Sequence, residues 1–226
     1  MVNSEVSLFG VIFDWDGVVI DSSVQHERSW EKLADEIGKP LPPDHFKKGF
    51  GKRNAVIIPE ILDWTDDFEE IERLGHRKEE LYRDLVESDG LKALPGIREL
   101  LEELKGRKIP CVVGTSTERE NLIMAFDILN LDSYFLGSTC SEDVTRGKPH
   151  PEVFLKSAKI MDMAPRNCVV LEDSSHGIEA ARAAGMKALG LATTRPPGML
   201  EQAGAHLVLA NPSEVNLALL ASLFED

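Results

Sequence analysis

The sequence predicts an α/β protein, with a parallel-sheet core and an inserted all-helical domain. Two observations lead to this prediction. Short, continuously apolar runs rich in β-branched residues alternate with amphipathic segments, which is the pattern of parallel strands buried between two layers of helices. From about residue 23 to residue 93 the alternation stops and only helical spacing is found.

The core strands are predicted from their apolar runs, and the helices between them from residues spaced three and four apart. One such helix carries Ile97, Leu100, Leu101 and Leu104, and another is expected around 118–129. The predicted strands are Leu8–Phe13, Cys111–Gly114, Cys168–Leu171, Ala188–Leu191 and Leu207–Leu209.

Two helical regions are predicted inside the insertion, and no strand. Trp30, Leu33, Ala34 and Ile37 fall on one helical face, and a second region begins near residue 65, with Phe68 opening its apolar face. We therefore expect a core domain of residues 1–22 and 94–226, and a helical cap domain of residues 23–93.

Composition limits the partners of this chain. The 226 residues carry a net charge of −14, which opposes binding to nucleic acid and to anionic membranes. A phosphorylated ligand would therefore need local positive charge. No apolar run is long enough to span a bilayer, and the start, MVNSEVSLFG, lacks the pattern of a signal peptide. We expect a cytoplasmic monomer whose three cysteines, Cys111, Cys140 and Cys168, are buried free thiols.

The first candidate for chemistry is Asp14-Trp15-Asp16, directly after the first apolar run. Residues two apart in extended backbone face the same side, so both carboxylates can enter one pocket at the carboxyl end of a strand, where open α/β sheets bind ligands. The alternative is a turn with two solvated aspartates, because the following Asp-Gly pair is a turn signal. The spacing does not fit an EF-hand loop.

Two further motifs could bind a phosphate. Thr115, Ser116 and Thr117 follow an apolar strand and precede a helix, where hydroxyls and free N–H groups can receive an anion or simply cap the helix. Lys148 lies between Gly147 and Pro149, which holds it on a short tether. This is not a P-loop, and in isolation a solvated surface lysine is the alternative.

The fourth motif is the acidic pair Glu172-Asp173, again at the end of an apolar run. Two buried carboxylates without a partner would cost several kcal/mol each, so a divalent cation is the economical partner. Oxygen ligands without a His/Cys cluster favour Mg²⁺ over zinc. Taken together, four strand ends in sequence order supply a pair of aspartates, a hydroxyl, a lysine and an acidic pair.

This order of motifs resembles the haloacid dehalogenase (HAD) superfamily. The resemblance runs from Phe9 to about Gly190 and includes FDWDGVVIDS, VVGTS, GKPHPEVF and VVLEDSSHGIEAARAAGM. It is similar to the branch with a helical cap inserted after the first motif, which includes phosphoglycolate phosphatases and β-phosphoglucomutase. The resemblance implies a Rossmann-like core, and the retained Asp16 favours phosphate-ester chemistry over dehalogenation.

The resemblance also implies roles for the motif residues. Asp14 would be the nucleophile that forms an aspartyl phosphate, and Asp16 the general acid and base. Thr115, Ser116 and Lys148 would hold phosphoryl oxygens. Mg²⁺ would be bound by Asp14, by the backbone carbonyl of Asp16 and by Asp173, with Glu172 in or next to the coordination shell. Because Asp16 must arrive protonated to act as an acid, we expect its pKa to be raised by burial or by the neighbouring carboxylate.

The cap is expected to choose the substrate. By their similarity to positions of the mutase, His26, Lys52, Arg53 and Lys78 are candidate substrate contacts, although the loop GFGKRN departs from the mutase pattern. The favoured function is a Mg²⁺-dependent phosphatase acting on a small phosphate monoester. A β-phosphoglucomutase-like phosphomutase is the alternative, and a non-catalytic phosphate-binding or regulatory protein is a weaker one.

Overall fold

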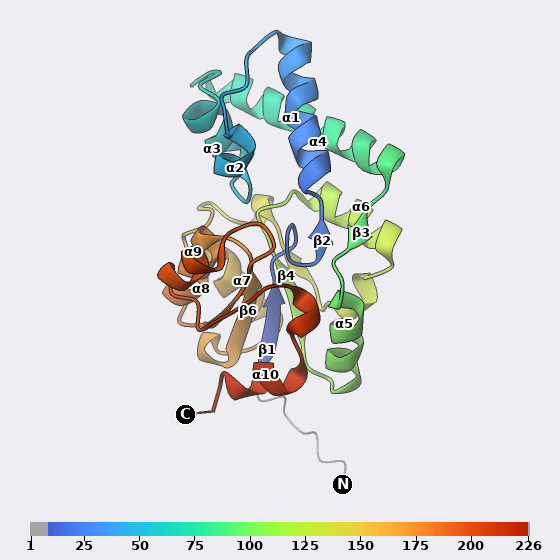
Figure 1. Ribbon diagram of the computed structural model, residues 1–226, viewed down its shortest axis with the longest axis vertical. Helices are drawn as coiled ribbons and strands as arrows, with labels where there is room; N and C mark the ends of the chain where they lie inside the picture. The colour runs from blue at the N-terminus through green and yellow to red at the C-terminus, as the bar shows by residue number, and fades with distance from the viewer. Residues whose placement is uncertain (1–8, 226) are drawn as a thin grey trace.

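The computed structural model describes residues 9–225, and its central element is a six-stranded parallel sheet (Figure 1). The strands lie in the order β5-β4-β1-β6-β7-β8. This confirms the predicted fold class and the five predicted strands, although the first begins at Gly10 rather than at Phe9. Leu8 lies outside the described residues. The strand bounds are β1 Gly10–Phe13, β4 Cys111–Gly114, β5 Ser138–Thr139, β6 Cys168–Glu172, β7 Lys187–Leu191 and β8 Leu207–Leu209.

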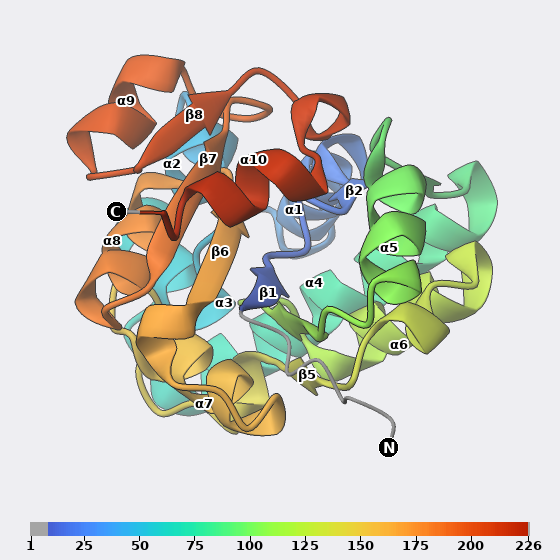
Figure 2. The ribbon, with the colours of Figure 1, turned by 90° about the horizontal axis from the view of Figure 1, so that it is seen from below.

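Helices cover both faces of the sheet, as continuously apolar strands require. In Figure 2, α5 and α6 lie on one side of the strands, and α7 and α8 on the other. Alternate residues of a strand enter the two cores, so that Val11 and Phe13 pack in one apolar cluster and Ile12 in the other. The core helices are α5 Ile97–Gly106, α6 Arg119–Leu129, α7 Glu152–Ile160, α8 Ser175–Ala183, α9 Pro197–Gln202 and α10 Leu217–Ser222.

In the described part of the chain, four short 3₁₀ turns complete the core. They are Asp132–Tyr134, Ser141–Asp143, Pro165–Asn167 and Pro212–Glu214. The three cysteines are buried and free, as predicted.

The inserted segment forms a separate helical layer beyond the carboxyl ends of the strands, at the top of Figure 1. Its own apolar cluster contains Trp30, Leu33 and Trp64, because α1 and the long α4 each turn one apolar face toward the other. The side chain of Asp67 caps α4 by accepting a hydrogen bond from the N–H of Glu70. The helices of the insertion are α1 Ser23–Ile37, α2 His45–Gly49, α3 Asn54–Val56, the π-helix Ile57–Ile61 and α4 Phe68–Asp89.

Two short strands join the insertion to the core. β2 (Ile20–Asp21) pairs antiparallel with β3 (Lys92–Ala93), so the chain enters and leaves the insertion side by side. The expectation that residues 23–93 contain no strand was therefore wrong for residues 92–93. The division into a core of 1–22 and 94–226 and a cap of 23–93 stays a prediction, and we use "cap" below for α1–α4 and their connecting loops.

Two further findings bear on the sequence predictions. Phe68 does not open the apolar face of α4, because its side chain is 73% exposed and the buried face begins later, at Leu74. Among residues 9–225, no helix is both long and apolar enough to cross a membrane.

Candidate active site

Three of the four predicted motifs meet because β1 lies between β4 and β6 in the sheet. The carboxyl ends of these strands carry Asp14, Thr115 and Glu172, and all three side chains are buried. Lys148 reaches the same place by another route. It was expected at a strand end, but it lies in the loop between the 3₁₀ turn Ser141–Asp143 and α7.

Lys148 is the positive centre of the site. Its Nζ lies 2.9 Å from Oδ1 of Asp14 and 2.7 Å from Oε2 of Glu172, and its side chain is only 3% exposed. The other oxygen of Glu172 accepts hydrogen bonds from the N–H of Asp173 and from the N–H and hydroxyl of Ser174. Glu172 therefore anchors the lysine, and one cation serves two buried carboxylates.

Lys148 does not balance all of the negative charge of the buried carboxylates. Burial, and then the charge of Glu172, raise the pKa of Asp14 to about 7 although Lys148 acts against them. Burial and the charges of Glu172 and Asp14 likewise raise the pKa of Asp173 well above its usual value. Negative charge is thus in excess at this point of the protein.

This excess fits a divalent cation. Asp14, Glu172 and Asp173 are buried, and each offers a carboxylate oxygen, with these oxygens all within 4.8 Å of one another. Such a set of hard oxygen donors suits Mg²⁺. Thr194 donates a hydrogen bond to Oδ2 of Asp173 and thereby orients it from the loop after β7.

Asp16 differs from the expectation. Its carboxylate accepts hydrogen bonds from the hydroxyls of Ser22 and Thr117, and Nε2 of His26 lies 3.4 Å from its Oδ1. Burial acts to raise the pKa of Asp16, but the partners His26, Ser22 and Thr117 outweigh it and lower the pKa to about 2. The predicted rise in pKa was wrong for the protein without substrate, because three nearby donors favour the ionised form.

The hydroxyls after β4 have different partners. Oγ1 of Thr115 contacts Oγ1 of Thr117 at 3.0 Å and accepts from the N–H of Thr117, so Thr115 supports the residue that holds Asp16. Ser116 lines the cavity in front of the site. Sequence reasoning included Thr117 in the motif but gave it no role, and it gave none to Ser22.

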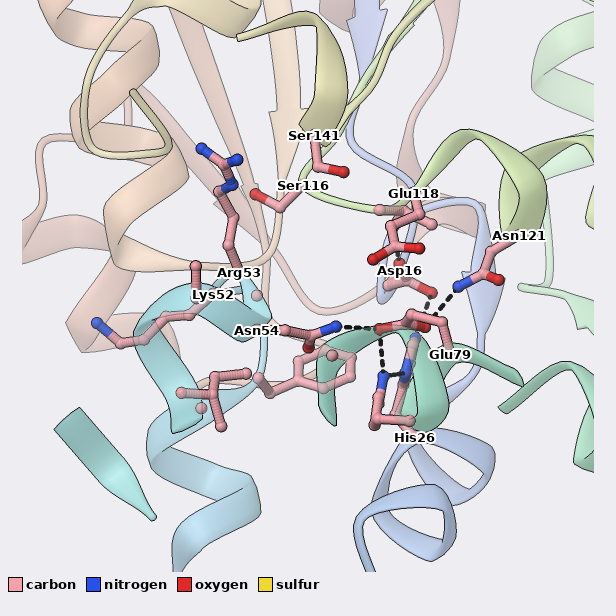
Figure 3. A pocket seen from close by; sticks show the side chains of 18 of the residues that line it. Asp16, His26, Lys52, Arg53, Asn54, Glu79, Ser116, Glu118, Asn121 and Ser141 are labelled. Atoms are coloured by element: carbon pink, nitrogen blue, oxygen red, sulfur yellow. Dashed lines mark hydrogen bonds and ion pairs between the residues drawn. The ribbon is translucent and has the colours of Figure 1, made fainter. Parts of the chain in front are cut away.

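A cavity of about 230 Å³ lies over Asp14 and Asp16 and is lined by both core and cap residues. All four predicted cap contacts line this cavity, namely His26, Lys52, Arg53 and Lys78. In Figure 3, the side chain of Arg53 extends toward the core loops that carry Ser116 and Ser141, whereas the amine of Lys52 points away from Asp16.

Each of these two side chains lies near a residue of the core. Cδ of Arg53 lies so near Gly147 that a Cβ built there would be 2.9 Å away, which places Arg53 against the loop of Lys148. Burial, and then the charge of Lys52, lower the pKa of His176 at the start of α8, so Lys52 lies near that core residue.

His26 and Lys78 lie deeper in the cavity wall. Nζ of Lys78 is 2.7 Å from Nδ1 of His26 and 2.9 Å from Oε1 of Glu79, and the lysine is 2% exposed. The ring of His26 stacks on Tyr82 with centroids 4.0 Å apart. Lys78 is therefore already paired within the cap, and His26 joins it to Asp16.

Glu79, Asn54 and Asn121 are pocket residues that sequence reasoning missed. Glu79 accepts from the side-chain amides of both asparagines (Figure 3). Their sequence positions gave no signal, because a glutamate on a charged helix ordinarily reads as a solvated residue.

Comparison with known proteins agrees with this site. The model of the haloacid dehalogenase-like hydrolase family matches residues 11–191. The chain is 34% identical over 217 residues to the chloroplastic 5-amino-6-(5-phospho-D-ribitylamino)uracil phosphatase of Arabidopsis thaliana, an alignment that covers 95% of this chain and 57% of that relative. It is 32% identical over 210 residues to the phosphorylated carbohydrates phosphatase of Thermotoga maritima, covering 91% and 95% of the two chains.

A solved structure has the same fold as this chain. The β-phosphoglucomutase of Clostridium difficile superposes with a TM-score of 0.84 at 27% identity, over 95% of this chain and 96% of that one. Since the family model matches most of the sequence, and a solved β-phosphoglucomutase shares the fold, the chain belongs to the haloacid dehalogenase-like hydrolases, among their phosphatases and phosphomutases.

Proposed function

We propose that this protein is a Mg²⁺-dependent phosphatase that hydrolyses a small phosphate monoester, such as a sugar phosphate or a phosphoglycolate-like metabolite. One observation carries the proposal. Asp14, paired with Lys148, and Asp16, held by Thr117 and Ser22, face the same cavity beneath the cap. A nucleophile, a cation and a second carboxylate in one pocket are what phosphoryl transfer needs.

In the first half of the reaction, a carboxylate oxygen of Asp14 attacks phosphorus. The bond from phosphorus to the ester oxygen breaks, its electron pair stays on that oxygen, and Asp16 donates the proton that the leaving alkoxide needs. Asp16 is ionised in the protein without substrate. A phosphoryl group at Asp14 adds negative charge close by, which raises the pKa of Asp16 and favours its acid form.

In the second half, Asp16 is the base. It takes a proton from water, the water oxygen attacks phosphorus, and the bond to Asp14 breaks, which releases phosphate and restores the carboxylate. Thr115, Ser116 and Lys148 are the proposed holders of phosphoryl oxygens. Asp14, Asp173 and the backbone carbonyl of Asp16 would hold Mg²⁺ beside Glu172, and the ion would supply charge neutralisation for the phosphoryl group.

The cavity supports a small substrate. At about 230 Å³, and lined on one side by the cap, it suits a metabolite rather than a polymer. His26, Lys52, Arg53 and Lys78 are the proposed cap contacts, with Arg53 the best placed for a direct one because it extends toward Ser116 (Figure 3). We propose a monomer in the cytoplasm.

A sugar phosphomutase is the second candidate, and the likeness to the Clostridium difficile β-phosphoglucomutase favours it. A mutase must keep water from the aspartyl phosphate, whereas a phosphatase must admit it. The two differ in the fate of the phosphoryl group, which an experiment can follow.

The experiment incubates the protein with Mg²⁺ and a panel of esters: glucose 6-phosphate, fructose 1-phosphate, glycerol 3-phosphate and phosphoglycolate. Free phosphate is measured. Release that EDTA and Asp14→Asn both abolish supports the phosphatase.

The alternatives have distinct outcomes. No release, together with conversion of glucose 1-phosphate to glucose 6-phosphate once glucose 1,6-bisphosphate is added, supports the mutase. The absence of both activities overturns both enzyme proposals and leaves a phosphate-binding role.

A further inference from the structure

Glu79 is a charged residue of the cap that is only 5% exposed and has polar partners on both carboxylate oxygens. Oε1 accepts from Nδ2 of Asn54 at 2.7 Å and from Nζ of Lys78 at 2.9 Å, and Oε2 accepts from Nδ2 of Asn121 at 2.6 Å. Burying a carboxylate is costly unless its oxygens are hydrogen-bonded. The three donors meet that cost here, and Lys78 and the other donors keep the pKa of Glu79 low against its burial.

One of these donors belongs to the core. Asn121 is on α6, whereas Glu79 is on α4 and Asn54 on α3 of the cap. The amide of Asn121 is held at both ends by α4, because its Oδ1 accepts from Arg83 at 3.0 Å while its Nδ2 donates to Glu79. This fixes which end of the amide faces Glu79. In the hydrogen bond between cap and core, Asn121 is therefore the donor and Glu79 the acceptor.

The opposite side of Glu79 leads to Asp16. An ammonium group can only donate, so in the 2.7 Å contact between Lys78 and His26 the ring atom Nδ1 is the acceptor. The ring proton of the neutral histidine is then on Nε2, which faces Oδ1 of Asp16 at 3.4 Å. Lys78, and with it the tautomer and position of His26, therefore depends on an acceptor at the place of Oε1 of Glu79.

We propose that Glu79 is a positioning residue: through Asn121 it fixes the cap in register on the core, and through Lys78 it sets His26 against Asp16. This inference rests on the proposed phosphatase function. It assigns Glu79 no contact with the reacting atoms. Its effect reaches the reaction through the residue that protonates the leaving group.

The hydrogen bond between Glu79 and Asn121 can be tested by exchanging its donor and its acceptor. Glu79→Gln turns an amide N–H₂ toward the amide of Asn121, and Asn121→Asp turns a carboxylate toward the carboxylate of Glu79, so each single change destroys the cap–core contact. The double variant Glu79→Gln/Asn121→Asp restores a donor facing an acceptor. The amide oxygen at position 79 can still accept from Lys78 and Asn54, and Arg83 can still donate to the new carboxylate at position 121.

Activity is measured as kcat/KM for the sugar phosphate of the panel that the wild type hydrolyses fastest. We expect each single variant to lose roughly tenfold or more, and the double variant to return to within about threefold of wild type. The matched control is Glu80→Gln, the same change one residue along α4, where the carboxylate is exposed and pairs only with Arg77 in the described structure. It should change kcat/KM less than about twofold.

A second readout separates positioning from simple loss of fold. p-Nitrophenyl phosphate has a good leaving group that needs no proton, so Glu79→Gln should lower kcat for it much less than for the sugar phosphate. Equal losses with both esters would overturn the proposal, as would a double variant whose loss is the product of the two single losses.

Each remaining result either supports or overturns the proposal. If a single variant does not fold, the double variant decides alone: near wild-type activity supports the proposal and a tenfold loss overturns it. A wild type inactive toward both esters defeats the proposed function itself, whereas an active wild type with unaffected single variants defeats only the role of Glu79.

Discussion

Asp14→Asn should stabilise the metal-free protein, and more so at higher pH. Asparagine keeps the shape of the aspartate but carries no charge, and Lys148 keeps Glu172 as its partner at 2.7 Å. The pKa of Asp14 in the folded protein is about 7, against 3.8 for the free side chain. The folded state therefore holds a proton on Asp14 at pH values where the unfolded chain has lost it.

The sign and size of the effect on stability follow from this difference in the pKa of Asp14. Below about pH 4, Asp14 is protonated in both states and costs nothing. Between about pH 4 and pH 7 the folded state binds more protons than the unfolded chain, so the free energy of unfolding falls as pH rises, and it is level above that range. The rise of about 3 pKa units corresponds to a full loss on the order of 4 kcal/mol, of which roughly 3 kcal/mol falls between pH 5 and pH 8.

The assay is urea unfolding in EDTA at pH 5 and pH 8, followed by circular dichroism. The free energy of unfolding of Asp14→Asn, relative to that of the wild type, should rise by roughly 3 kcal/mol from pH 5 to pH 8. The control is Asp35→Asn, which changes an exposed aspartate of α1 and should show no such rise. Added Mg²⁺ should stabilise the wild type and not the variant. A gain equal at both pH values, or a wild type that is relatively more stable at pH 8, would refute the reasoning.

Two further predictions test other contacts. Asp16→Ala should keep the affinity for Mg²⁺ measured by calorimetry within about threefold, whereas Asp173→Ala should lose at least about tenfold, because the proposed metal contact of Asp16 is a backbone carbonyl; equal losses would contradict these roles. Gly177→Ala should lower kcat at least about tenfold with little change in secondary structure, because a Cβ at 177 would lie 1.9 Å from Oε2 of Glu172 and displace the anchor of Lys148. Wild-type kcat in that variant would show that Glu172 can move without disturbing Lys148.

Much of the fold and the core of the site could be predicted from the sequence, because both depend on local patterns. A parallel strand buried on both faces must be continuously apolar, so Val11 and Ile12 predict a strand without any knowledge of its neighbours. Acidic and hydroxyl residues at the ends of such strands predict that Asp14 and Thr115 lie at one edge of the sheet. The two-residue strands β2, β3 and β5 were missed, because they are too short to show a period.

The protonation state and the cap contacts depended on distances between residues far apart in the sequence. His26, Ser22 and Thr117 lower the pKa of Asp16, and because Thr117 lies 101 residues later, no local pattern contains the whole set. Glu79 is buried where α4 packs near α6, and one of its donors, Asn121, is 42 residues away in the sequence.

The sequence by itself determined which residue types stand at the carboxyl edge of the sheet, because periodicity and strand ends are local properties. Only the tertiary structure decided how their charges are balanced. The pKa of a buried group depends on every charge and donor within a few ångströms, and the fold alone brings Lys148 to Asp14 and His26 to Asp16.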